Sequence, residues 1–109
     1  MTRKKLIDDI RKSMNSQEVM DKLSRTFSVL GDPTRARIIF ALFKAELCVV
    51  ELARLLEMNH SAISHQLRAL KDLDLVRYRK AGRRTYYSLN DEHIEVLFKE
   101  GLEHVLEKL

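Results

Sequence analysis

Four side chains near the C-terminus are of the types that bind metal ions. They are two carboxylates and two imidazoles, at Asp91, His93, His104 and Glu107. A tetrahedral set of imidazole nitrogens and carboxylate oxygens suits Zn(II), and Co(II) or Ni(II) can also bind such a set. The alternative is that they are surface acids and two solvated or core histidines on an ordinary dimerisation helix.

The spacing of these residues limits how they can act. Apolar residues recur every three or four positions over about residues 91–106, which predicts a helix. His93 and His104 are 11 residues apart, so along a helix they lie about 16 Å from each other. Zinc ligands lie only about 2.0–2.2 Å from the metal. One helix therefore cannot bring both histidines to a single ion.

The single cysteine, Cys48, offers little chemistry of its own. A chain with one thiol forms no intrachain disulfide and no two-thiol redox switch, in keeping with a reducing compartment. One thiolate is also a poor site for soft metals such as arsenic, cadmium or lead. We predict that Cys48 is a small buried apolar residue close to the start of a helix.

The charge of the chain is divided between two neighbouring segments. Residues 60–89 hold seven Lys and Arg against two Asp, a balance of +5, whereas residues 90–109 hold six acids against two Lys, a balance of −4. This division indicates that one surface meets a polyanion while the C-terminal segment has another role. A basic face that interacts only with solvent is the alternative.

The composition favours a single, largely helical domain. The 109 residues are 45% hydrophobic and 33% charged, with one Pro and three Gly. No apolar run approaches the roughly 20 residues that cross a bilayer, and residues 1–10 lack the apolar core of a signal peptide. We therefore expect a cytoplasmic protein with no membrane partner. No pairing of a nucleophile with a general base stands out, so we do not expect an enzyme.

Helical periodicity and capping residues predict the elements that position these side chains. Residues 17–30 read as an amphipathic helix that Gly31 closes. Asp32 caps a second helix, which starts at Pro33 and runs to about Lys44. The first ten or so residues read as a charged arm that can be helical.

Two short helices joined by a tight turn are typical of a helix-turn-helix. The first spans about residues 49–58 with Val50, Ala53 and Leu56 inward, and the second spans about residues 60–73. In such a motif the second helix lies in the DNA major groove. Its outward side chains can hydrogen-bond to base edges and phosphates. They are His60, Ser61, Ser64, His65, Gln66, Arg68 and Lys71.

Residues 75–89 change to an alternation of period two, which predicts a β-hairpin with its turn at Ala81 and Gly82. The tip gathers four basic residues: Arg79, Lys80, Arg83 and Arg84. A basic hairpin suits a wing along the phosphate backbone, where positive charge adds affinity but little sequence choice.

These features together resemble the ArsR/SmtB family of bacterial metal-responsive repressors. The strings that carry the resemblance are LGDPTRARII (30–39), ELCVVEL (46–52), HSAISHQLRALKDLDLV (60–76) and RRTYYSL (83–89). The resemblance implies a winged helix-turn-helix homodimer, mainly α with a β-hairpin wing, on an inverted-repeat operator in double-stranded DNA. Residues 1–15 would be an N-terminal arm or helical extension. Residues 16–109 would be the DNA-binding domain, with a dimerisation and metal-binding helix at 91–107.

The resemblance also implies a metal site. The family's interfacial zinc motif, Asp-x-His then ten residues then His-x-x-Glu, is matched by Asp91, His93, His104 and Glu107. An antiparallel helix of a second subunit would set the first two opposite the last two, giving two Zn(II) sites per dimer. A Cys-x-Cys site used by other members lacks its second thiol here.

The function that the resemblance implies is repression that ends when Zn(II), or alternatively Co(II) or Ni(II), lowers the affinity for DNA. The regulated genes would serve metal efflux or sequestration. In the family, the residue matching His104 donates from its non-ligating nitrogen to a backbone carbonyl near the end of the helix that lies in the DNA major groove, here about residues 60–73. The same fold with no metal response is the alternative.

Overall fold

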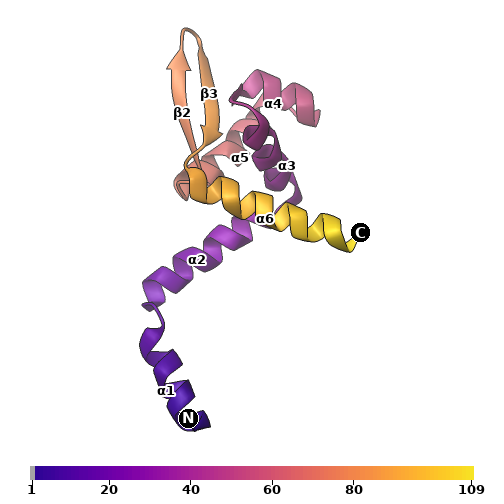
Figure 1. Ribbon diagram of the computed structural model, residues 1–109. Coiled ribbons are helices and arrows are strands. Elements are labelled where there is room, and N and C mark those ends of the chain that lie inside the picture. Colours follow the sequence, from indigo (N-terminus) through magenta and orange to yellow (C-terminus); the bar gives the residue numbers. More distant parts are fainter. Residues whose placement is uncertain (1) are drawn as a thin grey trace.

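The computed structural model describes residues 2–109 (Figure 1). Its helices are α1 (Arg3–Ser13), α2 (Gln17–Leu30), α3 (Pro33–Lys44), α4 (Val49–Leu56), α5 (His60–Asp72) and α6 (Glu92–Lys108). Its strands are β1 (Leu47–Cys48), β2 (Val76–Ala81) and β3 (Arg84–Leu89). The predicted mainly helical fold with a β-hairpin is confirmed.

The end of α2 and the start of α3 fall at the residues that the sequence predicts. The Asp32 carboxylate accepts the N–H of Arg35 at 3.0 Å and so caps α3, with Pro33 as its first residue. Gly31 ends α2 with φ −76°, which is ordinary right-handed backbone. This cap therefore depends on position rather than on the special conformational freedom of glycine.

The core lies between α3, α4, α5 and the base of the hairpin. Its largest fully buried side chains are Ile38, Ile39, Leu52, Ile63, Leu67, Leu70 and Leu75. Val76 and Leu89, which pair across β2 and β3, close the core on the sheet side. Because α5 contributes three of these buried residues, the core determines which face of α5 points outward.

The first helix of the helix-turn-helix is shorter than predicted. Glu57 adopts a left-handed conformation with φ 56°, so α4 ends at Leu56 rather than near residue 58. Val50 was expected to be buried but is 40% exposed, whereas Leu52 is fully buried. The helix is rotated so that Leu52, Ala53 and Leu56 face the core.

The hairpin belongs to a sheet of three strands in the order β1-β3-β2. Its turn is formed by Gly82 and Arg83, one residue later than predicted, because Ala81 pairs with Arg84. Gly82 has φ +63°, a conformation that glycine adopts without steric cost. The strand β1 was not predicted, since two residues are too few for a periodic signal.

The N-terminal helices α1 and α2 project away from the rest of the chain (Figure 1). With these helices included, the described chain measures 61 × 34 × 21 Å along its principal axes. Neither helix contains a buried residue, and their apolar stripe stays exposed at Ile7, Ile10, Val19, Leu23 and Phe27. In residues 2–109 no helix is both long and apolar enough to cross a membrane.

Candidate DNA-binding surface and metal-binding residues

The outward face of α5 is polar and slightly hollow. Asn59 starts this helix by accepting the N–H of Ala62 at 2.8 Å through its side-chain oxygen. Five of the predicted DNA-contacting residues line one hollow of about 430 Å³: His60, Ser61, Ser64, His65 and Arg68. Their hydroxyl, imidazole and guanidinium groups can hydrogen-bond to base edges and phosphates.

Two predicted residues of this helix lie away from the hollow. Gln66 is half-buried, and within residues 2–109 its Oε1 has no hydrogen-bond partner. Gln66 therefore lies only at the edge of the free face, because position 66 flanks the buried stripe that contains Leu67 and Leu70. Lys71 is exposed, and its Nζ lies 4.3 Å from the ring centroid of Tyr78. This cation–π contact ties α5 to the hairpin.

The four predicted wing cations are all exposed, but they differ in their partners. Arg79 donates from Nε to both carboxylate oxygens of Glu46 at 3.0 Å, and from Nη2 to Oε1 at 2.7 Å. Chiefly through these hydrogen bonds, the guanidinium holds the pKa of the Glu46 carboxyl below its ordinary value. Glu46 was not predicted to have a role, because its only signal in the sequence is an acid directly before a short apolar run.

The Cys48 side chain is 3% exposed, which confirms the predicted burial. It sits in β1 opposite Tyr86, and Arg84 donates from Nη1 to its Sγ at 3.5 Å. The backbone N–H of Cys48 donates to Glu51 Oε1 at 3.0 Å, and this bond is the main reason that the pKa of Glu51 is lowered. Arg84, predicted to contact DNA, is therefore also part of the junction between β3 and α4.

The predicted metal ligands divide between the two ends of α6. Asp91 is the N-cap: its Oδ1 accepts the N–H of Ile94 at 3.2 Å and lies 3.5 Å from His93 Nδ1. His104 and Glu107 lie near the other end, three residues apart and exposed. No group of three or more His, Cys, Asp or Glu within residues 2–109 of one chain is placed to hold a metal ion.

These residues fit two halves of a metal site. Each end of α6 offers one imidazole and one carboxylate, which are donors that Zn(II) takes. His93 is 95% exposed in its side chain, so its imidazole is free to turn toward a ligand outside its own chain. The structure brings Asp91 and His93 together but does not bring them to His104 or Glu107.

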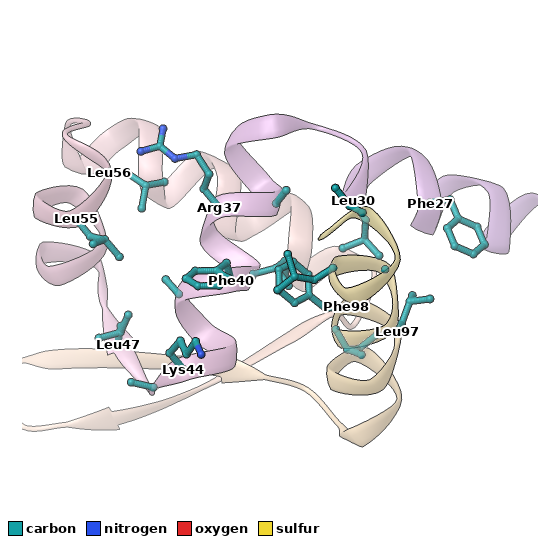
Figure 2. Close-up of a pocket in the computed structure, with 18 residues that line it drawn as sticks. Phe27, Leu30, Arg37, Phe40, Lys44, Leu47, Leu55, Leu56, Leu97 and Phe98 are labelled. Atoms are coloured by element: carbon teal, nitrogen blue, oxygen red, sulfur yellow. The ribbon is translucent and has the colours of Figure 1, made fainter. Parts of the chain in front are cut away.

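An apolar groove of about 940 Å³ runs beside α6. Figure 2 shows the side chains that line it, with Phe40 of α3 facing Phe98 of α6 and Phe27 of α2 at one end. The ring centroids of Phe40 and Phe98 are 6.2 Å apart. Several lining residues are strongly exposed in this single chain, including Phe27 at 53% and Val105 at 53%. Exposed apolar surfaces of this kind are typical of sites that contact another molecule.

The fold and the exposed basic surface define a winged helix-turn-helix regulatory protein. Residues 32–78 match the family described as "Bacterial regulatory protein, arsR family". A "Transcriptional repressor SmtB homolog" from Synechocystis sp. is 40% identical over 101 residues, covering 93% of this chain and 76% of the relative. The chain belongs to the arsR family, whose members are regulators rather than enzymes, as the sequence analysis expected.

Two further relatives extend the comparison. A "Cadmium resistance transcriptional regulatory protein CadC homolog" from Staphylococcus aureus is 37% identical, covering 90% of this chain and 81% of the relative. The solution structure of a homodimeric winged helix-turn-helix DNA-binding domain from Mycobacterium bovis matches with a TM-score of 0.75 and 29% identity. That match covers 88% of this chain and 90% of the other.

Proposed function

We propose that the protein is a transcriptional repressor that binds double-stranded DNA as a homodimer and leaves its operator when Zn(II) binds between the two chains. The division of four potential ligands between the two ends of α6 carries this proposal. One chain holds only an imidazole and carboxylate pair at each end. A second copy is needed to complete a shell of four ligands.

The apolar groove beside α6 offers a surface on which a second copy of the chain can pack. No residue of α6 is buried in the single chain, and the groove between α3 and α6 is apolar. A Cβ added at Gly101, which lines this groove, would meet nothing within 4 Å. The M. bovis domain of the same fold is homodimeric. We infer that α6 of one copy crosses α6 of the other near Gly101, where the missing side chain permits close approach.

In this arrangement Asp91 and His93 of one chain face His104 and Glu107 of the partner subunit, and symmetry makes two sites per dimer. Two nitrogen and two oxygen ligands suit tetrahedral Zn(II), with Co(II) and Ni(II) as chemically acceptable alternatives. The S. aureus relative is named for cadmium resistance. In this chain the lone Cys48 is buried and offers no thiolate pair for such a soft metal.

DNA would be bound by the outward face of α5 and by the hairpin. We assign base and phosphate contacts to the residues of the hollow on α5, and phosphate contacts to the wing cations other than Arg79, whose guanidinium is paired with Glu46. A symmetric dimer matches an inverted-repeat operator with half-sites about one helical turn apart. The controlled genes would serve metal efflux or sequestration, and the protein would act in the cytoplasm.

Release from DNA requires that the metal favour one dimer geometry over another. A metal that bound both forms equally would shift nothing, so the bridged dimer must hold its two α5 helices at a spacing that no longer fits the groove. His104 is the residue that we assign to this coupling. One imidazole nitrogen would face the metal, and the other would donate to a backbone carbonyl near the end of α5.

A second candidate function is the same DNA-binding dimer with no metal response. The observation in its favour is that Asp91 already has a structural role as the N-cap of α6. A carboxylate has two oxygens, however, and only Oδ1 makes the capping bond. Capping and metal binding are therefore compatible in one residue.

The test is a titration of the purified dimer with Zn(II) while its affinity for a selected operator duplex is read at fixed salt. We expect two ions per dimer and a loss of DNA affinity within the roughly 5- to 150-fold range of typical allosteric coupling. His104→Ala should abolish this loss, whereas Glu103→Ala, an exposed neighbour on the same helix, should retain it. Unchanged DNA affinity at saturating zinc would favour the second candidate.

A further inference from the structure

The hairpin is held on both of its faces. On one face, Lys71 of α5 lies over the ring of Tyr78 at 4.3 Å. On the other face, the Arg79 guanidinium lies 5.1 Å from the ring centroid of Tyr86 and reaches Glu46. Consecutive residues of a strand point to opposite faces of the sheet. Arg79 therefore lies on the face that points away from the contact with α5.

The register of the sheet explains how Arg79 reaches Glu46. Cys48 pairs with Tyr86, and Tyr86 pairs with Arg79, so these three residues form one row across the three strands. Glu46 precedes Cys48 by two residues and lies on the same face of the sheet. The fork of Arg79 grips both of its carboxylate oxygens at 2.7–3.0 Å. This two-pronged geometry is specific to arginine.

We propose that Arg79 is a positioning residue for DNA binding: its bidentate ion pair with Glu46, called the clasp below, holds the hairpin in place, and Arg79 makes no phosphate contact. Lys80, on the same face as Tyr78, and Arg83, in the turn, then make the phosphate contacts of the wing. This inference rests on the DNA-binding function proposed above. The clasp matters because Glu46 directly precedes β1, which runs straight into α4. The Arg79–Glu46 pair thereby sets the angle of the hairpin relative to the helix-turn-helix.

The charge of Glu46 also supports a positioning role for Arg79 rather than a phosphate contact. The Glu46 carboxylate neutralises the Arg79 guanidinium at hydrogen-bond distance and would repel a phosphate placed beside it. If Arg79 instead bound a phosphate, Glu46 would be a competitor, and its removal would strengthen DNA binding. The two roles therefore predict opposite signs for Glu46→Gln.

The experiment measures the affinity of the full-length dimer for a labelled duplex of mixed sequence over a range of KCl concentrations. The slope of log affinity against log salt counts the phosphates that the protein neutralises. Because the dimer carries each substitution twice, we expect Lys80→Gln and Arg83→Gln each to reduce the magnitude of the slope by about 1.8, and Arg79→Gln to leave it unchanged. Glu46→Gln and Arg79→Gln should each weaken binding by up to about fivefold, and the double variant should bind no more weakly than either.

Three controls sharpen the result. Glu103→Gln removes the same charge from exposed α6 and should not weaken binding. Arg79→Lys keeps the charge but loses the fork, so it should behave as Arg79→Gln does. Amide hydrogen exchange of the hairpin, read without DNA, should quicken in Glu46→Gln and Arg79→Gln but not in Lys80→Gln.

The clasp would be refuted if Arg79→Gln lowered the magnitude of the slope by about 1.8, or if Glu46→Gln bound DNA more tightly. If amide hydrogen exchange of the hairpin were unchanged in both Glu46→Gln and Arg79→Gln, the clasp would be refuted without reference to DNA binding. Failure of the wild-type protein to bind the duplex in a salt-dependent manner would instead overturn the proposed DNA-binding function, and the assignment of Arg79 with it.

Discussion

Asp91 Oδ1 lies 3.5 Å from His93 Nδ1 and also accepts the backbone N–H of Ile94 at 3.2 Å. One carboxylate thus starts α6 and stands beside a residue that we assign to the metal site. Because the two roles use the same side chain, substitutions at Asp91 can separate them. Capping α6 requires only a side chain of this shape with an oxygen that accepts a hydrogen bond, whereas the proposed metal binding requires its negative charge.

Asp91→Asn and Asp91→Ala should differ in stability but not in zinc affinity. Asparagine caps a helix about as well as aspartate, whereas alanine costs about 1 kcal/mol at this position. Both variants lack the anionic ligand, so we expect each to bind Zn(II) at least about tenfold more weakly. Calorimetric zinc titration and thermal unfolding measure the two effects. Wild-type zinc affinity in Asp91→Asn would show that this carboxylate is only a cap.

His104→Ala should separate metal binding from DNA release more completely than Asp91→Asn does. His104 is assigned both a metal contact and the hydrogen bond toward α5, whereas Asp91 has only the former. At zinc concentrations that saturate each variant, DNA release should persist in Asp91→Asn and be lost in His104→Ala. Equal release in the two variants, measured by anisotropy of a labelled operator, would exclude the relay through His104.

Substitutions at Gly101 test whether α6 of a second chain crosses α6 near this residue. Within one chain an added Cβ meets nothing within 4 Å, so by helix propensity alone Gly101→Ala should stabilise α6 by about 1 kcal/mol. If a partner helix crosses there, Gly101→Leu should instead dissociate the dimer. Analytical ultracentrifugation at several protein concentrations reads the assembly. A Gly101→Leu dimer as tight as the wild type would place the interface elsewhere.

Gly82→Ala should weaken the wing. Gly82 has φ +63°, and a residue with a Cβ in left-handed backbone costs about 1–2 kcal/mol. We expect a lower midpoint of thermal unfolding and faster amide exchange in β2 and β3. The same midpoint in Gly82→Ala and the wild type would mean that the turn rearranges freely.

The Glu51 carboxyl should make stability depend on pH. Its pKa is lowered in the folded protein, chiefly by the backbone N–H of Cys48. A carboxyl with a lowered folded pKa stabilises the protein above its ordinary pKa, and this contribution disappears as the pH falls through the folded value. Wild type should therefore exceed Glu51→Gln in stability near neutral pH, and the difference should shrink in acid. Denaturant unfolding at several pH values measures it, and a constant difference would contradict this account.

The helices, including α5, and the pairs of candidate metal ligands on α6 were predictable because the signals for them are local. Asn59 caps the amide three residues later, and the core stripe of α5 repeats every three or four positions at Ile63, Leu67 and Leu70. Helix geometry also implied that His93 and His104 cannot share an ion in one chain, and no such cluster occurs in residues 2–109.

Contacts across the sheet were decided by tertiary structure alone. Glu46 and Arg79 are 33 residues apart, and Cys48 and Arg84 are 36 apart. Both contacts depend on the two-residue strand β1 pairing with β3, which no local pattern signals. The same holds for Val50 and Gln66, whose exposure depends on how α4 and α5 are rotated against α3. Periodicity identifies which residues share a helix face, but the packing of neighbouring elements determines which face is covered.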